Sequence, residues 1–204
     1  MSKFDYSQTG LPSNPHWMLA TDLCHQWLGT NMTMFGPERH LAFMANQPVA
    51  AAKRVFDNCD QFTPECITVL LLGPAKGDLI ETEGAERMAR HLFGDRVVDL
   101  VQALSDPAAQ AKADASLLRD VGRIVLAEGI STMNDQLIGR ARIDRHHQVR
   151  WDILRHLEDQ GQRIAGVDPR LDDLFSDALV QSRQALEALD AAASSKKPPT
   201  PPTV

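Results

Sequence analysis

The stretch LDDLFSDALVQSRQALEAL, residues 171–189, decides the fold class. Its apolar and small side chains recur at spacings of three and four, which places them on one face of an α-helix. The preceding pair Asp168-Pro169 supplies an N-cap and a proline in the first turn, where the missing N–H costs nothing. The pattern therefore predicts one long helix, with Leu174 and Phe175 buried at its centre. The residues of the stripe are Leu171, Leu174, Phe175, Ala178, Leu179, Ser182, Ala185, Leu186 and Leu189.

Helical spacing continues through most of the chain, with turn signals between the segments. The one rival to a helix is the run ITVLLL, residues 67–72, whose composition also fits a buried strand. The start of its segment at Thr63-Pro64 favours a helix. We therefore predict an all-α domain of about seven helices. The expected helices cover about residues 17–28, 41–56, 63–72, 83–92, 95–105, 117–133 and 135–160, before the one at 171–189.

Both ends of the chain differ in composition from the middle. Residues 1–14 have few apolar anchors, and we expect a flexible N-terminus there. The stretch AAASSKKPPTPPTV, residues 191–204, has no apolar residues large enough to form a core. We expect it to be a disordered, Pro-rich tail, in preference to a PxxP ligand. The predicted helical domain thus spans residues 15–190.

The composition excludes several function classes. Lys and Arg number 21 against 27 Asp and Glu, a net charge of −6, which argues against a nucleic-acid-binding face. The longest apolar run is too short to span a membrane, and the first residues lack a secretory signal. Three cysteines without CxxC spacing indicate reduced thiols rather than a zinc site. These features predict a cytoplasmic protein.

Common catalytic signatures are missing from the sequence. It contains no GxxxxGK[ST], GxGxxG, GxSxG or HExxH motif. The segment Gly73–Asp78 has the wrong spacing for a phosphate loop, and we predict a turn between helices there. No pair among the early histidines has metal-ligand spacing, and His146 and His147 are adjacent, so they point to different sides of a helix. We expect no catalytic residue, no metal and no cofactor on these grounds.

The segment Arg140–Arg163 is rich in basic residues, partly offset by acidic ones. A solvated helix face with ion pairs such as Asp152 with Arg155 is one interpretation. A binding site for a nucleotide phosphate, with Arg142 and Arg145 as its candidate residues, is a second, and a partner interface is a third.

Three segments together resemble the HD-type hydrolase domain of the RelA/SpoT family of (p)ppGpp hydrolases. LFGDRVVDLV, residues 92–101, is similar to the family segment F-G-x-x-V-x-x-L-V. LAEGISTM, residues 126–133, resembles L-A-D-x-x-x-N-M, where the family's Asp is a metal ligand. Pro48-Val49-Ala50 is loosely similar to the family's H-P-x-x-V-A. The resemblance spans about residues 20–160 and implies an all-α, HD-like fold.

The metal ligands of that family are not found at the matching positions. Counting back from Phe93 puts the family's His-Asp pair on Lys76-Gly77 and its E-D-T on Ile80-Glu81-Thr82, and a shifted alignment puts the acidic pair on Gly77-Asp78. The late Asp is replaced by Glu128. The resemblance thus implies a vestigial pocket without the His-Asp motif. Its residues are Lys76, Asp78, Glu81 and Glu128.

We consider three functions. The first is a catalytically silent, HD-like regulatory protein that binds a guanine nucleotide or a protein partner. The second is a metal-dependent phosphohydrolase with a rearranged site, drawn from His40, Glu81 and Glu128. The third is a protein-interaction adaptor. In the first, Lys76 is expected to replace the charge of the missing cation and to pair with Glu128 or Glu81.

Overall fold

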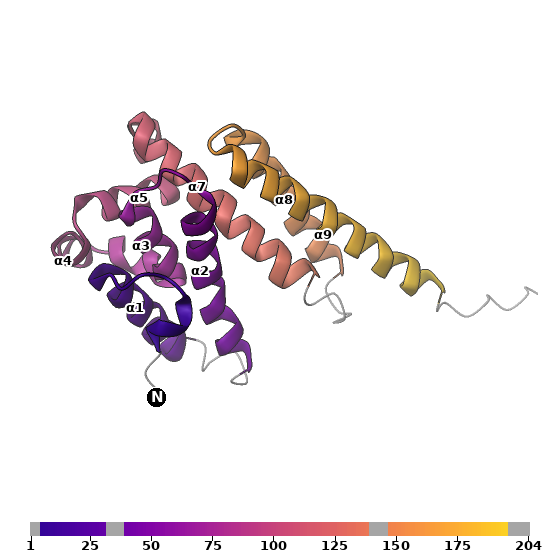
Figure 1. The fold of residues 1–204 in the computed structure, drawn as a ribbon, viewed down its shortest axis with the longest axis horizontal. Coiled ribbons are helices and arrows are strands. Elements are labelled where there is room, and N and C mark those ends of the chain that lie inside the picture. Colours follow the sequence, from indigo (N-terminus) through magenta and orange to yellow (C-terminus); the bar gives the residue numbers. More distant parts are fainter. Residues whose placement is uncertain (1–4, 32–38, 139–146, 196–204) are drawn as a thin grey trace, which may run out of the picture.

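Helices follow one another along the computed structural model, which describes residues 5–31, 39–138 and 147–195 (Figure 1). Over these ranges there is no strand, and nine α-helices form one domain. The all-α prediction is confirmed, and the short helix at Pro107–Ala111 is additional to the expected ranges. The helices are α1 Pro15–Asn31, α2 Arg39–Asn58, α3 Pro64–Leu72, α4 Glu83–Phe93, α5 Asp95–Ser105, α6 Pro107–Ala111, α7 Ala115–Thr132, α8 His147–Ile164 and α9 Pro169–Ser195. Shorter elements are η1 Tyr6–Thr9, η3 Gly73–Ile80 and a π-helical segment, η4, Met133–Ile138.

The helix starts follow from local hydrogen bonds of side chains. The Thr63 hydroxyl accepts from the backbone N–H of Cys66, and the Thr82 hydroxyl accepts from that of Ala85. Asp106 caps α6 in the same way, ahead of a proline. These caps satisfy N–H groups that have no partner inside the helix. The run at residues 67–72 is therefore helical, and the strand alternative is wrong.

Several sequence-based boundaries need correction. The expected turn at residues 73–78 is the 3-10 helix η3. Helix α5 begins at Asp95, as expected, and Gly94 with φ +87° is its N-cap. Of the helix expected over 135–160, the structure describes the π-helical η4 up to Ile138 and α8 from His147, and residues 139–146 lie outside the described ranges.

The ends of the domain also extend beyond the predicted limits. In the N-terminal segment, Thr9 and Leu11 are buried, so it packs on the domain from residue 5 onward. The last helix, α9, continues to Ser195. Alanine and serine at 191–195 add a final helical turn because they do not interrupt the backbone hydrogen bonds.

The centre of the core is α3, which is buried from Cys66 to Leu72. Helices α1, α2, α5 and α7 surround it (Figure 1). Because it has neighbours on every side, α3 shows no polar face, and this explains why its sequence resembled a buried strand. No helix in the described ranges is long and apolar enough to cross a membrane.

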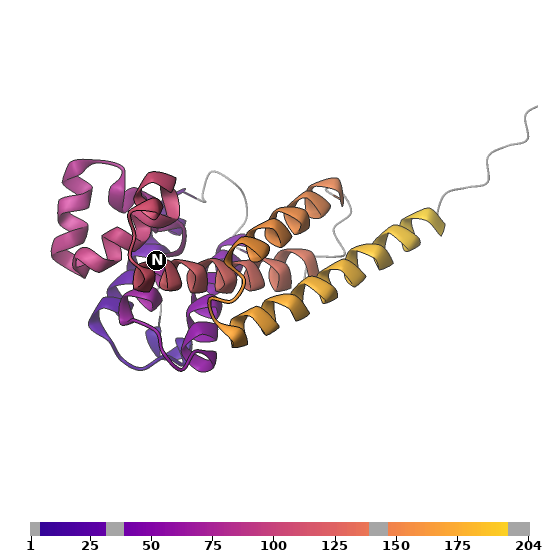
Figure 2. The ribbon, with the colours of Figure 1, turned by 90° about the horizontal axis from the view of Figure 1, so that it is seen from above.

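Helices α7, α8 and α9 form an arm that runs away from this body (Figure 2). Phe175 of α9 fills its centre and is 4% exposed, whereas its neighbour Leu174 is only partly buried. Two glycines allow the ring to approach. A Cβ placed on Gly129 of α7 would lie 2.7 Å from the Phe175 ring, and one on Gly161 of α8 would lie 2.4 Å from it.

Candidate functional site

A cavity of about 250 Å³ lies between α2, η3 and α7, close to where α7 leaves the body for the arm. Most of its wall is apolar, and its polar side chains gather on η3 and α7 and at one position of α2. The lining residues are Gln47, Pro48, Ala51, Gly73, Pro74, Lys76, Glu128, Ser131 and Thr132.

The wall depends on a close contact between a proline and a glycine. Pro48 lies inside α2, and Gly73 ends α3 with φ +51°. A Cβ on Gly73 would lie 2.6 Å from Cγ of Pro48 and 3.2 Å from Sγ of Cys24. The positive φ and the missing side chain both require glycine here. This contact brings η3, and with it Lys76, alongside α2.

Lys76 and Glu128 form an ion pair across the cavity, with Nζ donating to Oε1. Their side chains are 23% and 37% exposed, so both are accessible from the cavity. The two residues are 52 positions apart in the chain. The structure thus brings together the two positions for which the resemblance implied a common pocket, and their charges neutralise each other.

Two further polar groups of the wall were not found from the sequence. Ser131, one turn after Ala127 on α7, accepts a hydrogen bond of 2.7 Å at its Oγ from Nη1 of Arg54 on α2. Gln47 has its Nε2 buried without a hydrogen-bond partner. A buried amide donor that makes no bond lowers stability, so this wall contains a donor without a partner.

Asp78 and Glu81, the other two residues of the expected pocket, do not line the cavity. Both are exposed, at and just after the end of η3. A 3-10 helix has three residues per turn, so Asp78, two positions after Lys76, points to a different side of η3. Glu81 follows the last residue of η3. Of the four residues expected in one pocket, the structure therefore brings Lys76 and Glu128 together and leaves Asp78 and Glu81 outside this cavity.

Arg142 and Arg145 lie outside the described residues. The described part of the basic segment favours the solvated-face interpretation. Arg155 forms an exposed ion pair of 3.2 Å with Asp152, as predicted, and Arg183 of α9 pairs with Glu158. Such exposed pairs contribute little to stability.

No three His, Cys, Asp or Glu side chains come together as a possible metal site within the described ranges. The three cysteines are free and buried. Burial raises the pKa of both Cys24 and Cys59 to about 12, which keeps these thiols protonated.

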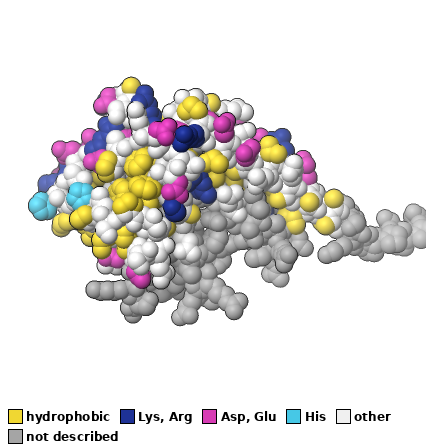
Figure 3. Space-filling view, in the orientation of Figure 1, with side chains coloured by type: hydrophobic (Ala, Val, Ile, Leu, Met, Phe, Trp, Pro, Cys, Tyr) yellow, Lys and Arg dark blue, Asp and Glu magenta, His cyan; other side chains and the backbone are white. Residues whose placement is uncertain are grey.

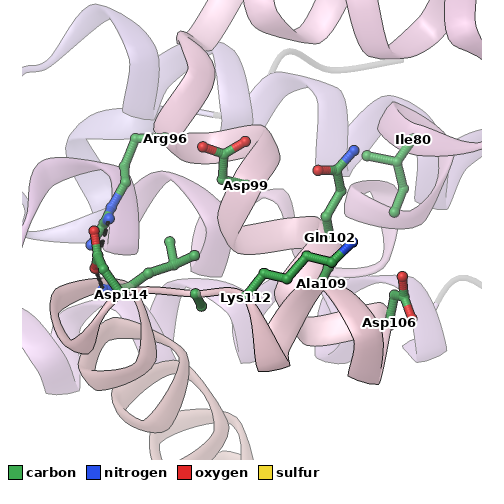
Figure 4. Close-up of a pocket in the computed structure, with 10 residues that line it drawn as sticks. Ile80, Arg96, Asp99, Gln102, Asp106, Ala109, Lys112 and Asp114 are labelled. Carbon is green, nitrogen blue, oxygen red and sulfur yellow. Dashed lines mark hydrogen bonds and ion pairs between the residues drawn. The ribbon is translucent and has the colours of Figure 1, made fainter.

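A second hollow, of about 660 Å³, lies between α5, α6 and the start of α7 (Figure 4). Its charged side chains are largely engaged in local contacts. Arg96 pairs with Asp114 at 3.7 Å and with the buried Asp120 at 3.3 Å, Asp99 pairs with Arg90 at 3.3 Å, and Asp106 caps α6. Arg96, Asp99, Asp106 and Asp114 thus have partners within the protein.

The sequence also gave no indication of a buried ion network between the body and the arm. Asp120 and Arg123 of α7 pair at 3.2 Å, and Arg123 pairs with Asp168 at 3.1 Å. The Thr63 hydroxyl donates to Asp120 at 2.9 Å. Each charge has a partner, so the network joins the starts of α3 and α9 to α7.

The surface offers no single dominant charge on the face in Figure 3. Apolar side chains gather over the helical body, and positive and negative side chains lie beside each other elsewhere on this face. In comparisons with models of protein families, with curated proteins and with solved structures, no match to this chain was found.

Proposed function

We propose that this chain is a non-catalytic, HD-like regulatory domain that binds a nucleotide in the cavity at Lys76 and Glu128. The observation that carries the proposal is the ion pair between these two residues inside a cavity.

The resemblance to the RelA/SpoT hydrolase domain supports the proposal through two positions. Lys76 matches the family's His-Asp pair when the residues are counted back from Phe93, and Glu128 matches its late metal ligand. The two family positions meet at one metal, and here the two side chains meet in one ion pair. An HD-like arrangement of α2, η3 and α7 accounts for this meeting.

The charge of Lys76 favours binding over hydrolysis. A divalent cation next to Glu128 would be repelled by the ammonium group, which already neutralises that carboxylate. Activation of water for attack on a phosphoester requires several ligands that fix such a cation. A lysine in this place therefore favours a pocket that holds a ligand without cleaving it.

Calorimetry with GDP and GTP tests the proposal. We expect saturable binding to the full chain at or below millimolar concentration, and a loss of at least tenfold in affinity in Lys76→Met. Lys53→Met is the matched control, because Lys53 forms a comparable pair with Asp57 on the outer face of α2. Absence of binding by the wild type at millimolar nucleotide would contradict the proposal and favour the adaptor.

The phosphohydrolase alternative has its own measurement. We expect purified protein to contain no stoichiometric transition metal and to leave (p)ppGpp intact. Near-unit Mn or Zn by elemental analysis, with turnover that Glu128→Ala abolishes, would establish the enzyme instead. The predicted phosphate contacts of Arg142 and Arg145 are tested by Arg142→Ala and Arg145→Ala, which should weaken nucleotide binding and leave the free energy of unfolding unchanged.

A further inference from the structure

The cavity at Lys76 has an ion pair at its polar end and mostly apolar walls. Among the described lining residues, Lys76 and Glu128 are the charged ones and each neutralises the other, while Arg54 reaches the wall through its hydrogen bond to Ser131. The apolar part of the wall includes Pro48, Ala51, Gly73 and Pro74. A group that enters this space exchanges contact with water for contact with a mostly apolar wall. At the polar end it meets the Lys76 ammonium and the Glu128 carboxylate.

The ion pair leaves hydrogen-bonding capacity on both partners. An ammonium group has three N–H donors, and a carboxylate has two oxygens with several lone pairs. The contact joins Nζ of Lys76 to Oε1 of Glu128. The remaining donors of Lys76 and the second oxygen of Glu128 are thus neighbours, and they match a ligand edge that carries an acceptor next to a donor.

A phosphate group fits this site poorly. It would attract Lys76 but would also stand beside the Glu128 carboxylate, and like charges at this distance repel each other. Drawing Lys76 away from Glu128 would also give up the contact between them, a loss that the phosphate contact would have to offset. A neutral group avoids both effects because it leaves the ion pair in place.

We propose that the cavity holds the nucleobase end of the ligand, with one polar edge of the ring bound by Lys76 and Glu128 together, and that the phosphates stay outside. This inference rests on the proposed function and specifies which end of the ligand enters. The size agrees, since about 250 Å³ lies below the range of pockets that enclose a whole drug-sized molecule. Planar ring faces also suit the proline-lined walls.

Gln47 supplies a second, independent indication of a polar ring. Its Nε2 is buried in the wall of the same cavity without an acceptor. A ring carbonyl or ring nitrogen carries the kind of acceptor that this donor lacks. An aliphatic ligand without a hydrogen-bond acceptor would leave this donor unsatisfied.

The test is calorimetry with matched probes on the full chain. The probes are guanosine, inosine and adenosine on one side and inorganic phosphate and pyrophosphate on the other. We expect at least one nucleoside to bind within about tenfold of its nucleotide, and pyrophosphate neither to bind in the cavity nor to displace the nucleoside. Glu128→Gln, which keeps the shape of the side chain, should weaken nucleoside binding by about tenfold or more. Asp57→Asn is its control on the outer face of α2.

The outcomes separate this inference from the proposed function. Binding of nucleotides without nucleosides, together with displacement by pyrophosphate, would overturn the inference and leave the proposed function standing. Binding of a nucleoside or free base but of no nucleotide would support the inference and remove the proposed function. Binding of none of these probes would overturn both. If Glu128→Gln does not fold, competition between nucleoside and pyrophosphate on the wild type decides the question.

Discussion

Two adjacent residues of α7, Glu128 and Gly129, lie on different sides of the helix, one at an open cavity and the other in a tightly packed contact. Gly129 faces α8 and α9, where the Phe175 ring occupies all the space that a side chain would need. Glu128 faces α2 and η3, where a cavity of about 250 Å³ remains open. One side of the helix is closed by apolar contact, and the other is kept open around an ion pair. The difference indicates that the closed side maintains the fold and the open side is available for a ligand.

The closed side should show the largest effect of a single substitution. Phe175→Ala removes a ring that is 4% exposed and held between Gly129 and Gly161, which cannot fill the space that it leaves. We expect a loss of about 3–5 kcal/mol in the free energy of unfolding. Chemical denaturation measures it.

Val180→Ala on the same helix is the control for that experiment. Val180 is 54% exposed, so its truncation should change stability by no more than about 0.5 kcal/mol. A loss below about 1 kcal/mol in Phe175→Ala would mean that α9 does not pack on α7 and α8 as the structure has it.

This closed side could be predicted from the sequence, and the open side could be predicted only in part. The spacing of the stripe at 171–189 placed Phe175 in the core, because the period of a helix fixes which residues share a face. Periodicity has no means of showing which glycines receive the ring. Gly129 and Gly161 become partners of Phe175 only through the packing of three helices.

The open side lacks a local signal of that kind. Lys76 and Glu128 meet across 52 residues of chain, and only the resemblance to a family placed them together. The same resemblance grouped Asp78 and Glu81 with them, but these side chains are exposed, within η3 and directly after it, and do not line the cavity. The network of Asp120, Arg123 and Asp168 gave no signal for the same reason, since its pairs are set by tertiary structure.

The next effect concerns the wall of the open side. Gly73→Ala places a Cβ 2.6 Å from Cγ of Pro48 on a backbone with φ +51°. Both the strain and the overlap destabilise the native state, and we expect a loss of about 2–3 kcal/mol. Gly77→Ala is the matched control in η3, because a Cβ there meets nothing within 4 Å. Equal stability of the two variants in thermal or chemical unfolding would show that the contact between α2 and η3 does not form the wall.

The ion pair itself should contribute less to stability. Lys76→Ala leaves Glu128 without its partner, but that carboxylate is 37% exposed and can be hydrated. We expect a loss of about 1 kcal/mol, near the upper end for exposed pairs. Lys53→Ala, which removes a more exposed pair, should cost less. A loss of 3 kcal/mol or more in Lys76→Ala would make the pair a part of the core rather than of a binding site.

The smallest expected effect is on the reaction rates of the buried thiols. These rates distinguish local opening of the cavity wall from unfolding of the whole domain. Cys24 is 2% exposed and lies directly behind the cavity wall, with Sγ 3.2 Å from where a Cβ on Gly73 would stand. Burial raises the pKa of Cys24 to about 12, an effect that the charge of Lys76 partly offsets. Reaction with a thiol reagent at pH 8 therefore requires the protein to open.

Each region predicts its own pattern of thiol reactivity. Phe175→Ala destabilises the whole domain, so Cys24, Cys59 and Cys66 should all react faster, by similar factors. Lys76→Ala disturbs only the cavity wall, and we expect at most a fewfold increase, confined to Cys24. Mass spectrometry of the labelled peptides measures the three rates separately. Reaction of Cys24 within seconds in the wild type, or a uniform increase in Lys76→Ala, would contradict the division of α7 into a closed side and an open side.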